Sequence, residues 1–522
     1  MSADLALTDA HVLTMNRAQP HAEAIAVKGN RILKVGSNSE ISKLFGKNTQ
    51  VIHLRGKTVL PGFIDTHIHV TDFGQSLLWM TLDGVNSIKE LQDRLKKRVG
   101  KTPKGRWIIG RGWNQSCFRE KRLPNRFDLD AVSPQNPVVL YHQSGQLCVV
   151  NSKALKLAGV TNQTSPPSGG VIDKAADTAE LIGVLRESAT NLIWAVIPGP
   201  TEEELMEATE RACQKIVESG VTSVHWMVLS SIELSIARRL LAQNRLPLRV
   251  YMVVPANLSD KIEDFGTQNS LNLKVGGAVI SADGYLAART AALLQPYSDT
   301  PSESGKLLCT QEEMNLVATK ILKKGLQLVI HAMGDRAVET ALTTLEQVST
   351  EVPREARRSR MEQAAVLNKG LIERMKRQNV IVSVQPCVIA SEFSAWSAAK
   401  HLGSERARWL YPLKTMLKEG MRVAGGSDCP MEPLNPLLGV QMAVTREYFP
   451  EERLTVDEAL RIYTIDAAYS SSEESIKGSI APGKIADLTV LSHNPLAISP
   501  YTIKDIDVEM TIVGGKTVYS KH

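Results

Sequence analysis

The sequence predicts an α/β protein built on a (β/α)8, TIM-like barrel, with an insertion domain after the first barrel strand and a small β-sandwich formed by both termini. Three observations carry this prediction. The middle of the chain alternates short apolar strands with amphipathic helices, both ends are rich in strands, and a long segment separates the first two barrel strands. At ~150 residues per domain, 522 residues favour two to four domains.

The two ends of the chain, residues 1–59 and 477–522, together predict the β-sandwich. The N-terminal part contains three alternating or β-branched apolar runs, DLALTDAHVLTM, AIAVKGNRILKVG and TQVIHLRGKTVL. Hairpin turns are expected at Lys28-Gly29-Asn30 and Arg55-Gly56-Lys57. The C-terminal part has the same character, in GKIADLTVLS and VEMTIVGGKTVYS with a Gly514-Gly515 turn, so we expect one β-domain that draws strands from both ends.

The barrel is expected to comprise residues 60–71 and 201–476. A capping box of Thr201 and Glu204 begins one helix, another helix covers about 311–324, and Thr455 with Glu458 caps a last helix over 455–468. Eight strand candidates alternate with such helices, and this rhythm is typical of a parallel sheet closed into a barrel. The strands are expected within 59–70, 220–228, 248–254, 273–284, 326–335, 359–367, 379–386 and 421–428.

Residues 72–200 lie between the first and second barrel strands and predict an insertion domain over the barrel mouth. The segment contains two strand-like runs, WIIGRGWN and NPVVLYHQSG, and a Pro/Ser/Gly stretch, TSPPSGG. A connection of this length inside a compact domain needs structure of its own.

Composition excludes several classes of function. Hydrophobic residues make up 43% and charged residues 22%, and six cysteines are scattered without a CxxC pair, which suits a globular protein of a reducing compartment. The net charge of +6 is a mild surplus without a basic stripe, so neither nucleic acid nor membrane is expected as a partner. The N-terminus lacks the pattern of a signal peptide, and no apolar run reaches the roughly 18–20 residues of a membrane span, so the cytoplasm is the expected location.

His67 and His69 are the strongest chemical signal among the eleven histidines. They end the apolar run VLPGFIDTHIH, and residues i and i+2 of a strand point to the same face, so both imidazoles can converge on one ion. The carboxyl ends of parallel barrel strands are where barrel enzymes place their sites. The alternative is a pair of surface histidines at a strand end.

Two further strand ends carry candidate ligands. His331 ends LQLVIHAMGD, and Asp428 ends MRVAGGSD beside two glycines that leave room for an ion or a water. The alternatives are a core histidine for His331 and a helix N-cap for Asp428, a common position for aspartate.

These residues stand in motifs that resemble the amidohydrolase superfamily, namely LPGFIDTHIH, HAMGD, GGSDCP and APGKIADLTVL. RGWNQ, VNSKAL, HAMGDRAV, VSVQP and SDCPMEPLNP narrow the resemblance to the amidohydrolase family 3 branch that includes N-substituted formamide deformylase. The resemblance implies a metal-dependent hydrolase with a (β/α)8 barrel and a β-sandwich from both termini. It carries metal-ligand roles onto His67, His69, His331 and Asp428, and it implies a homodimer.

Three positions depart from the family pattern. Val279 stands where relatives commonly have a bridging lysine, Gln363 where they have a sixth-strand histidine ligand, and Gln146 where they have a histidine of the insertion. The remaining residues, with an open position for water, predict a mononuclear site. The expected cofactor is one Zn per chain, with Fe, Mn or Ni as alternatives, because imidazole and carboxylate accept several divalent ions.

Six further residues are candidate substrate contacts. Gln363 is expected either to donate to a substrate carbonyl or to bind the ion weakly through its oxygen. His225 ends the second strand and is a substitute ligand, a substrate contact or a core histidine, while Asp283 is a site carboxylate or a turn residue before Gly284. The others are Trp113 and His142 from the insertion and Arg289 after the fourth strand.

The expected function is hydrolysis of a C–N bond in a small-molecule amide, formamide or cyclic amide by a metal-activated water. Asp428 would take the proton of the water and return it to the leaving nitrogen, while His331 holds the ion or stabilises the oxyanion. Two alternatives remain: a non-hydrolytic metal-dependent enzyme, such as an isomerase or lyase, and a binding protein on a degenerate barrel.

Overall fold

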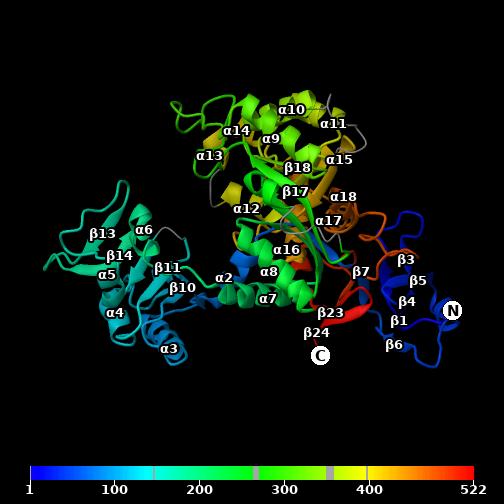
Figure 1. Ribbon diagram of the computed structural model, residues 1–522, viewed down its shortest axis with the longest axis horizontal. Coiled ribbons are helices and arrows are strands. Elements are labelled where there is room, and N and C mark those ends of the chain that lie inside the picture. The colour runs from blue at the N-terminus through cyan, green and yellow to red at the C-terminus, as the bar shows by residue number, and fades with distance from the viewer. Residues whose placement is uncertain (1, 145–146, 263–269, 349–357, 395–397, 522) are drawn as a thin grey trace. The chain divides into compact units, whose positions relative to one another are not determined.

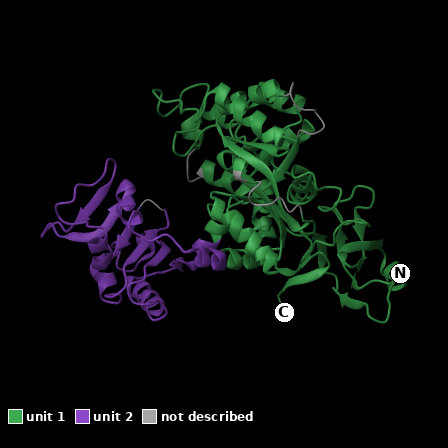
Figure 2. Cartoon of the chain, in the orientation of Figure 1, with its two compact units in different colours: residues 1–73, 209–522 green, residues 74–208 purple. Residues whose placement is uncertain are grey.

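The computed structural model describes residues 2–144, 147–262, 270–348, 358–394 and 398–521. The chain forms two compact units, one of residues 1–73 and 209–522 and one of residues 74–208 (Figure 2). Gln146, a position of interest in the sequence, lies outside the described residues. Among the described helices, none has both the length and the apolar composition needed to cross a bilayer.

The larger unit contains an eight-stranded sheet in which every pairing is parallel and each strand follows its neighbour in chain order. The strands are nearly continuous runs of buried residues, as expected of a sheet covered by helices. They are β8 (Phe63–Ile68), β15 (Val221–Met227), β16 (Arg249–Pro255), β17 (Leu273–Ser281), β18 (Gln327–Ala332), β19 (Arg360–Gln363), β20 (Ile381–Val384) and β21 (Arg422–Gly425). The alternation of strands and helices confirms the prediction of a TIM-like barrel sheet (Figure 1).

The first and last strands of this sheet meet along a seam. Asp428 N donates to His67 O at 2.8 Å, and His69 N donates to Cys429 O at 2.9 Å. Just below them, Ser427 N donates to the Asp65 carboxylate at 2.9 Å. The seam therefore joins β8 to the segment that follows β21.

Amphipathic helices connect the strands and pack their apolar faces on the sheet. The capping boxes of Thr201, Thr310 and Thr455 are present, each with a glutamate three residues later. The helices of the larger unit include α7 (Glu202–Glu218, whose first seven residues belong to the smaller unit), α8 (Ser231–Ala242), α9 (Gln311–Lys323), α10 (Asp335–Val348), α11 (Lys369–Arg377), α12 (Pro386–Ser394), α13 (Ala398–Leu402), α14 (Ser404–Ala407), α15 (Leu413–Lys418), α16 (Pro436–Thr445), α17 (Val456–Ile462) and α18 (Ile465–Ser470).

Two sheets are formed by the termini. One has the order β5-β4-β1-β6, and the other, β24-β23-β22-β7-β2-β3, combines strands from both ends of the chain. Their apolar side chains share one cluster, in which Leu7 and Ile25 of the first sheet meet Val59 and Leu488 of the second. The strands are β1 (Leu5–Thr8), β2 (His11–Leu13), β3 (His21–Ala22), β4 (Ala24–Lys28), β5 (Arg31–Gly36), β6 (Gln50–His53), β7 (Thr58–Pro61), β22 (Leu488–Leu491), β23 (Val508–Val513) and β24 (Lys516–Ser520).

The smaller unit, residues 74–208, has a six-stranded sheet of its own. Two apolar clusters cover this sheet, one around Trp113 and Leu140 and one around Val139 and Leu185. Its strands are β9 (Met80–Thr81), β10 (Ile108–Trp113), β11 (Val138–His142), β12 (Leu147–Val150), β13 (Val171–Lys174) and β14 (Leu181–Arg186), and its helices include α3 (Ile88–Val99), α4 (Arg126–Asp130), α5 (Ser152–Leu157) and α6 (Asn191–Trp194), while α2 (Val70–Leu78) crosses the boundary between the units.

Two local predictions were wrong. Lys28-Gly29-Asn30 and Gly514-Gly515 do make hairpins, but Arg55-Gly56-Lys57 connects β6 and β7, which belong to different sheets. The helix expected over 455–468 is broken into α17 and α18 at Thr464, whose backbone leaves the helical region and whose hydroxyl bonds to Leu460 O. A threonine hydroxyl that caps the preceding turn competes with helix continuation.

Candidate metal centre

His67, His69 and Asp428 form the one cluster of potential metal ligands found among the described residues, with one donor atom of each within 4.8 Å of the others. His67 lies on β8, His69 follows that strand at once, and Asp428 lies just past β21. The seam of the barrel therefore brings these three side chains together at the carboxyl ends of its strands.

The distances within the cluster fit a divalent ion. Asp428 Oδ1 lies 3.5 Å from His67 Nε2 and 3.6 Å from His69 Nε2, longer than good hydrogen bonds. Two ligands of a tetrahedral zinc, each bound at 2.0–2.1 Å, are separated by about 3.4 Å. A set of two imidazoles and one carboxylate at this spacing leaves a coordination position open for water.

The orientation of the His67 ring is fixed from the inside of the barrel. Its Nδ1 lies 2.7 Å from the Glu362 carboxylate on β19, which leaves Nε2 to face Asp428. Glu362 in turn forms a fully buried ion pair with Arg360, whose guanidinium also reaches His225 Nδ1 at 2.7 Å. A carboxylate bonded to the second nitrogen of a ligand histidine sets its tautomer and raises its basicity.

The charges of the site follow from burial and from this network. Burial raises the pKa of Glu362, but Arg360 and His67 outweigh it and hold the value at about 2. Burial lowers the pKa of His67, but Glu362, with Asp428, brings it above the usual value. An ion would displace the proton on Nε2 and leave the Nδ1 proton shared with Glu362.

His69 and His331 are neutral at neutral pH. Burial, followed by the charge of His67, lowers the pKa of each to about 4. Burial raises the pKa of Asp428, which suits a group that takes up and returns a proton. Neutral imidazoles are the form that binds metals.

A cavity of about 510 Å³ opens beside the cluster. His331, at the end of β18, lines this cavity but does not belong to the three-residue cluster, so its place is on the wall next to the ion position. The ring of Tyr285 lies 5.5 Å from the His331 ring. The remaining wall is mostly apolar: Met227, Val228, Leu229, Pro255, Val279, Met333, Val388, Pro430 and Met431, with the polar residues Asp72, Ser281 and Gln363.

Three residues predicted as substrate contacts do not line this cavity. Asp283 is buried and accepts hydrogen bonds from the backbone of Ala292, Met333 and Gly334, so it anchors the loop after β17. Arg289 forms an ion pair with Asp299 at 2.7 Å. His225 is fully buried under the site, against Arg360. Asp283 and Arg289 therefore have structural partners, while His225 is engaged through Nδ1 and its Nε2 is buried without a hydrogen-bond partner among the described residues.

Trp113 and His142 lie in the smaller unit. The Trp113 indole, a candidate substrate contact in the sequence, is fully buried and donates through Nε1 to Leu140 O, so it packs in the core of this unit. The His142 ring packs edge-on against it with centroids 5.0 Å apart and bonds through Nδ1 to Ser144. Both side chains thus serve the packing of their own unit.

Sequence reasoning missed Glu362, Arg360, Tyr285 and Tyr411. A signal for the first two was present: Arg360 and Glu362 are charged residues two apart on one predicted strand, so both side chains point to the same face. Buried charges are found where they are paired. Tyr285 and Tyr411 come from loops, whose course the spacing of residues does not specify.

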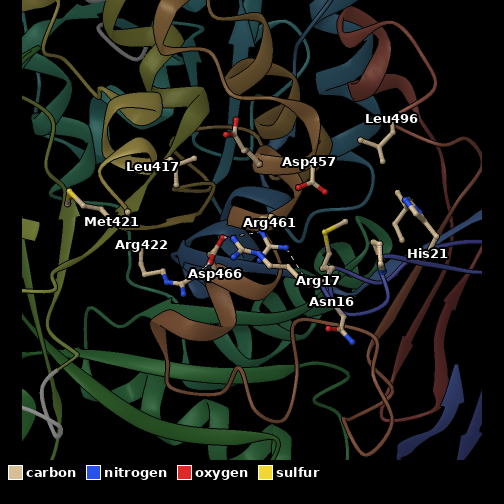
Figure 3. A pocket seen from close by; sticks show the side chains of 15 residues that line it. Asn16, Arg17, His21, Leu417, Met421, Arg422, Asp457, Arg461, Asp466 and Leu496 are labelled. Carbon is tan, nitrogen blue, oxygen red and sulfur yellow. Dashed lines mark hydrogen bonds and ion pairs between the residues drawn. The ribbon is translucent and has the colours of Figure 1, made fainter.

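A second cavity, of about 580 Å³, lies at the amino-terminal end of β21 (Figure 3). There, Arg422 bonds to the Asp466 carboxylate at 2.8 Å and Arg461 approaches it to 4.0 Å. The figure shows these side chains converging on Asp466. Because the charges pair with one another and this face of a barrel serves stability, we assign the cavity a structural role.

Comparison with known proteins identifies the family of the chain. The profile of the amidohydrolase family matches residues 50–519. The chain belongs to the amidohydrolase family. Members of this family are metal-dependent, and this amidohydrolase is therefore a hydrolase with a candidate metal site built from His67, His69 and Asp428.

Individual amidohydrolases resemble the chain over almost its full length. It is 33% identical to YtcJ of Bacillus subtilis (strain 168), a protein classed with the amidohydrolases, over 98% of each chain. It is 28% identical to N-substituted formamide deformylase of Arthrobacter pascens, over 99% of this chain and 98% of that one. An uncharacterised metal-dependent hydrolase of Pyrococcus furiosus superposes with a TM-score of 0.78 at 31% identity, covering 94% of this chain and 99% of that one.

Proposed function

We propose that this amidohydrolase cleaves the C–N bond of a small amide, formamide or cyclic amide at a site that holds one divalent ion. The observation that carries the proposal is the cluster of His67, His69 and Asp428 at the edge of a mostly apolar cavity. When bound, the ion would lower the pKa of a water molecule and polarise the scissile carbonyl.

The side chains of the site supply the remaining chemistry. Asp428 accepts a proton from the attacking water and passes it to the leaving nitrogen as the C–N bond breaks. Burial raises the pKa of Asp428, which makes its carboxylate a stronger base toward the proton of the water. His331, neutral and on the cavity wall, is placed to donate a hydrogen bond to the substrate.

A single ion is favoured by the two positions that differ from the family pattern. Val279 and Gln363 both line the cavity, and neither offers a charged or imidazole ligand. A valine side chain cannot bridge two metals, and an amide oxygen is a weak ligand beside imidazole and carboxylate. Zinc is our first choice because it accepts a four-coordinate arrangement of nitrogen and oxygen ligands.

The cavity wall favours an uncharged substrate. Among the described residues that line it there is no lysine or arginine, while Asp72 and Asp428 contribute carboxylates. An anionic group would therefore meet no positive side chain other than the ion position itself. The similarity to a formamide deformylase supports formamides and small N-substituted amides as the first compounds to test.

Two measurements test the proposal. Elemental analysis of protein loaded with Zn, Mn, Fe or Ni should give one ion per chain. Metal-loaded protein should hydrolyse members of a panel of N-alkyl and N-aryl formamides and acetamides, which release an amine, and of cyclic amides, which open to an amino acid. In each case 18O from labelled water should appear in the new carboxylate. Turnover without 18O would indicate an isomerase or lyase, and failure to bind metal would refute the hydrolase.

A further inference from the structure

Gln363 has a fixed orientation at the end of β19, the sixth barrel strand. The Tyr411 hydroxyl donates a 2.6 Å hydrogen bond to Gln363 Oε1, and its oxygen also lies 3.6 Å from Met333 Sδ. Burial raises the pKa of Tyr411 well above its usual value, so the phenol remains a donor. The amide oxygen of Gln363 is therefore already engaged inside the protein.

The amide nitrogen of Gln363, unlike the amide oxygen, has no hydrogen-bond partner among the described residues. Gln363 lines the cavity beside His67, His69 and Asp428. Within the described part of the chain, no hydrogen bond engages Nε2, although the side chain is only 2% exposed. Two N–H donors are thus presented to the cavity, in the region where a substrate carbonyl would lie beside the ion position.

Both partners of this hydrogen bond are held in unusual backbone conformations. Gln363 and Tyr411 have φ angles of 69° and 48°, in the left-handed region that side chains other than glycine rarely adopt. Tyr411 N donates to Ala365 O at 2.9 Å, and Arg446 donates to Tyr411 O at 2.6 Å. Such conformations are strained and concentrate at functional sites, where surrounding bonds hold them.

We propose that Gln363 is a catalytic hydrogen-bond donor to the substrate carbonyl oxygen, not a metal ligand, and that Tyr411 is the positioning residue that turns its amide toward the substrate. The inference rests on the proposed hydrolase function. As the water oxygen bonds to the carbonyl carbon, the C=O π electrons move to oxygen, and Gln363 Nε2 donates to that oxygen. When the C–N bond breaks, its electron pair stays on nitrogen, which takes the proton from Asp428.

Three variants test this role. Gln363→Met keeps the size of the side chain but has no hydrogen-bond donor. Gln363→Glu keeps an oxygen that can accept from Tyr411 and can bind a metal, but it loses the N–H donor. Tyr411→Phe removes the hydroxyl that holds the amide of Gln363, so the amide is free to rotate. A preorganised donor to an oxyanion contributes ~10²–10³-fold to kcat. We expect both Gln363 variants to lose that factor in kcat on the best amide of the panel, with one ion still bound per chain and little change in KM. Tyr411→Phe should lower kcat by about tenfold.

A binding measurement separates this inference from the proposed function. Infrared spectra of 13C-carbonyl-labelled N-butylacetamide, bound to metal-loaded protein, should show a carbonyl stretch that rises in Gln363→Met relative to the unchanged chain. An identical stretch in both would overturn the donor role, even if no compound of the panel is hydrolysed. Loss of the ion in Gln363→Met with recovery in Gln363→Glu would instead make Gln363 a ligand and refute the inference while leaving the hydrolase intact.

Discussion

At the scale of single residues, the site concentrates left-handed backbone. Asp428, with a φ of 62°, shares this conformation with Gln363 on another strand, and both side chains line the same cavity. The Asp428 conformation is held by the hydrogen bond from its own N–H to His67 O. The direction in which the Asp428 carboxylate points therefore depends on the backbone conformation as well as on the side-chain rotamer.

Asp428→Asn is expected to lower kcat by ~10²–10⁴-fold, because the amide can neither accept the proton of the water nor return it to nitrogen. The replacement is nearly isosteric, so the fold should remain. Steady-state rates at saturating metal measure the effect. Asp457→Asn, an exposed carboxylate of α17, is the matched control and should keep the original rate.

Glu392 on α12 is expected to make the folding stability of the metal-free protein depend on pH. Both of its carboxylate oxygens are buried without a hydrogen-bond partner among the described residues, and burial raises its pKa from 4.5 to about 8. A group with a raised folded pKa stabilises the fold below its unfolded pKa, and this contribution is lost as the pH rises toward 8. Between pH 6 and pH 8 the loss amounts to about 2–3 kcal/mol.

Glu392→Gln should therefore show a smaller fall in melting temperature between pH 6 and pH 8 than the unchanged chain, measured by calorimetry without metal. Glu405→Gln, an exposed glutamate, should melt with the original pH dependence. Equal falls in all three proteins would show that Glu392 is ionised in the fold at pH 6.

At the scale of elements, three of the four residues of β19 contribute to the candidate site. Arg360 and Glu362 face the barrel interior, while Gln363 ends the strand at the cavity. Glu362, held by Arg360, supports His67 of β8, which lies close in space but far away in sequence. This strand therefore couples the stability of the barrel interior to the affinity of the metal centre.

Glu362→Gln should weaken metal binding by ~10–100-fold, as loss of the carboxylate partner of a ligand histidine does. The variant also leaves Arg360 buried without its partner, at a cost of ~3–5 kcal/mol. The double variant Arg360→Met/Glu362→Gln should recover most of the stability but not the affinity, which competition with a metal chelator measures.

A partly exposed ion pair outside the site provides the matched control. Arg358 and Glu474 are joined at 2.8 Å with side chains 30% and 29% exposed. Arg358→Met/Glu474→Gln should change stability by ~0–1 kcal/mol and leave metal affinity unaltered. If the buried and the exposed double variants bind metal equally well, the Glu362 carboxylate has no role in holding the ion.

The sequence predicted strands and helices well, because the periodicity of apolar residues determines their positions. It predicted site residues poorly where they come from loops or form buried polar pairs. Seven of the eight barrel strands fall inside the expected ranges, and β16 extends one residue past its range, because most buried parallel strands are apolar runs. His67, His69 and Asp428 were found because each ends such a run. Tyr411 was not found, because it comes from a loop. The environments of Asp283 and Trp113 depend on backbone groups distant along the chain, N–H groups of Met333 and Gly334 for Asp283 and the carbonyl of Leu140 for Trp113.

At the scale of the whole molecule, the metal centre coincides with the seam of the barrel. Two of the candidate ligands come from β8 and its end, and the third comes from the segment after β21. An ion bound there would add a link where the sheet closes on itself and would stabilise the folded chain by mass action.

Removal of the ion by a chelator should lower the melting temperature, since a ligand at 1,000 times its Kd contributes ~4 kcal/mol. His69→Ala should abolish the difference between metal-loaded and metal-free protein, because it removes a ligand from the seam. His493→Ala, an exposed histidine of the C-terminal part, should retain that difference. A metal-dependent shift in His69→Ala as large as in the original chain would place the ion elsewhere.

The seam also sets an order of events during synthesis. His67 and His69 leave the ribosome long before Asp428, since most of the barrel is encoded between them. At ~5–20 residues per second, the interval is on the order of tens of seconds. The nascent chain thus carries two imidazoles without their carboxylate partner for most of its production, and a chain that stops before the last barrel strand cannot assemble the three-ligand centre. Metal acquisition is consequently a step that follows translation of nearly the whole protein.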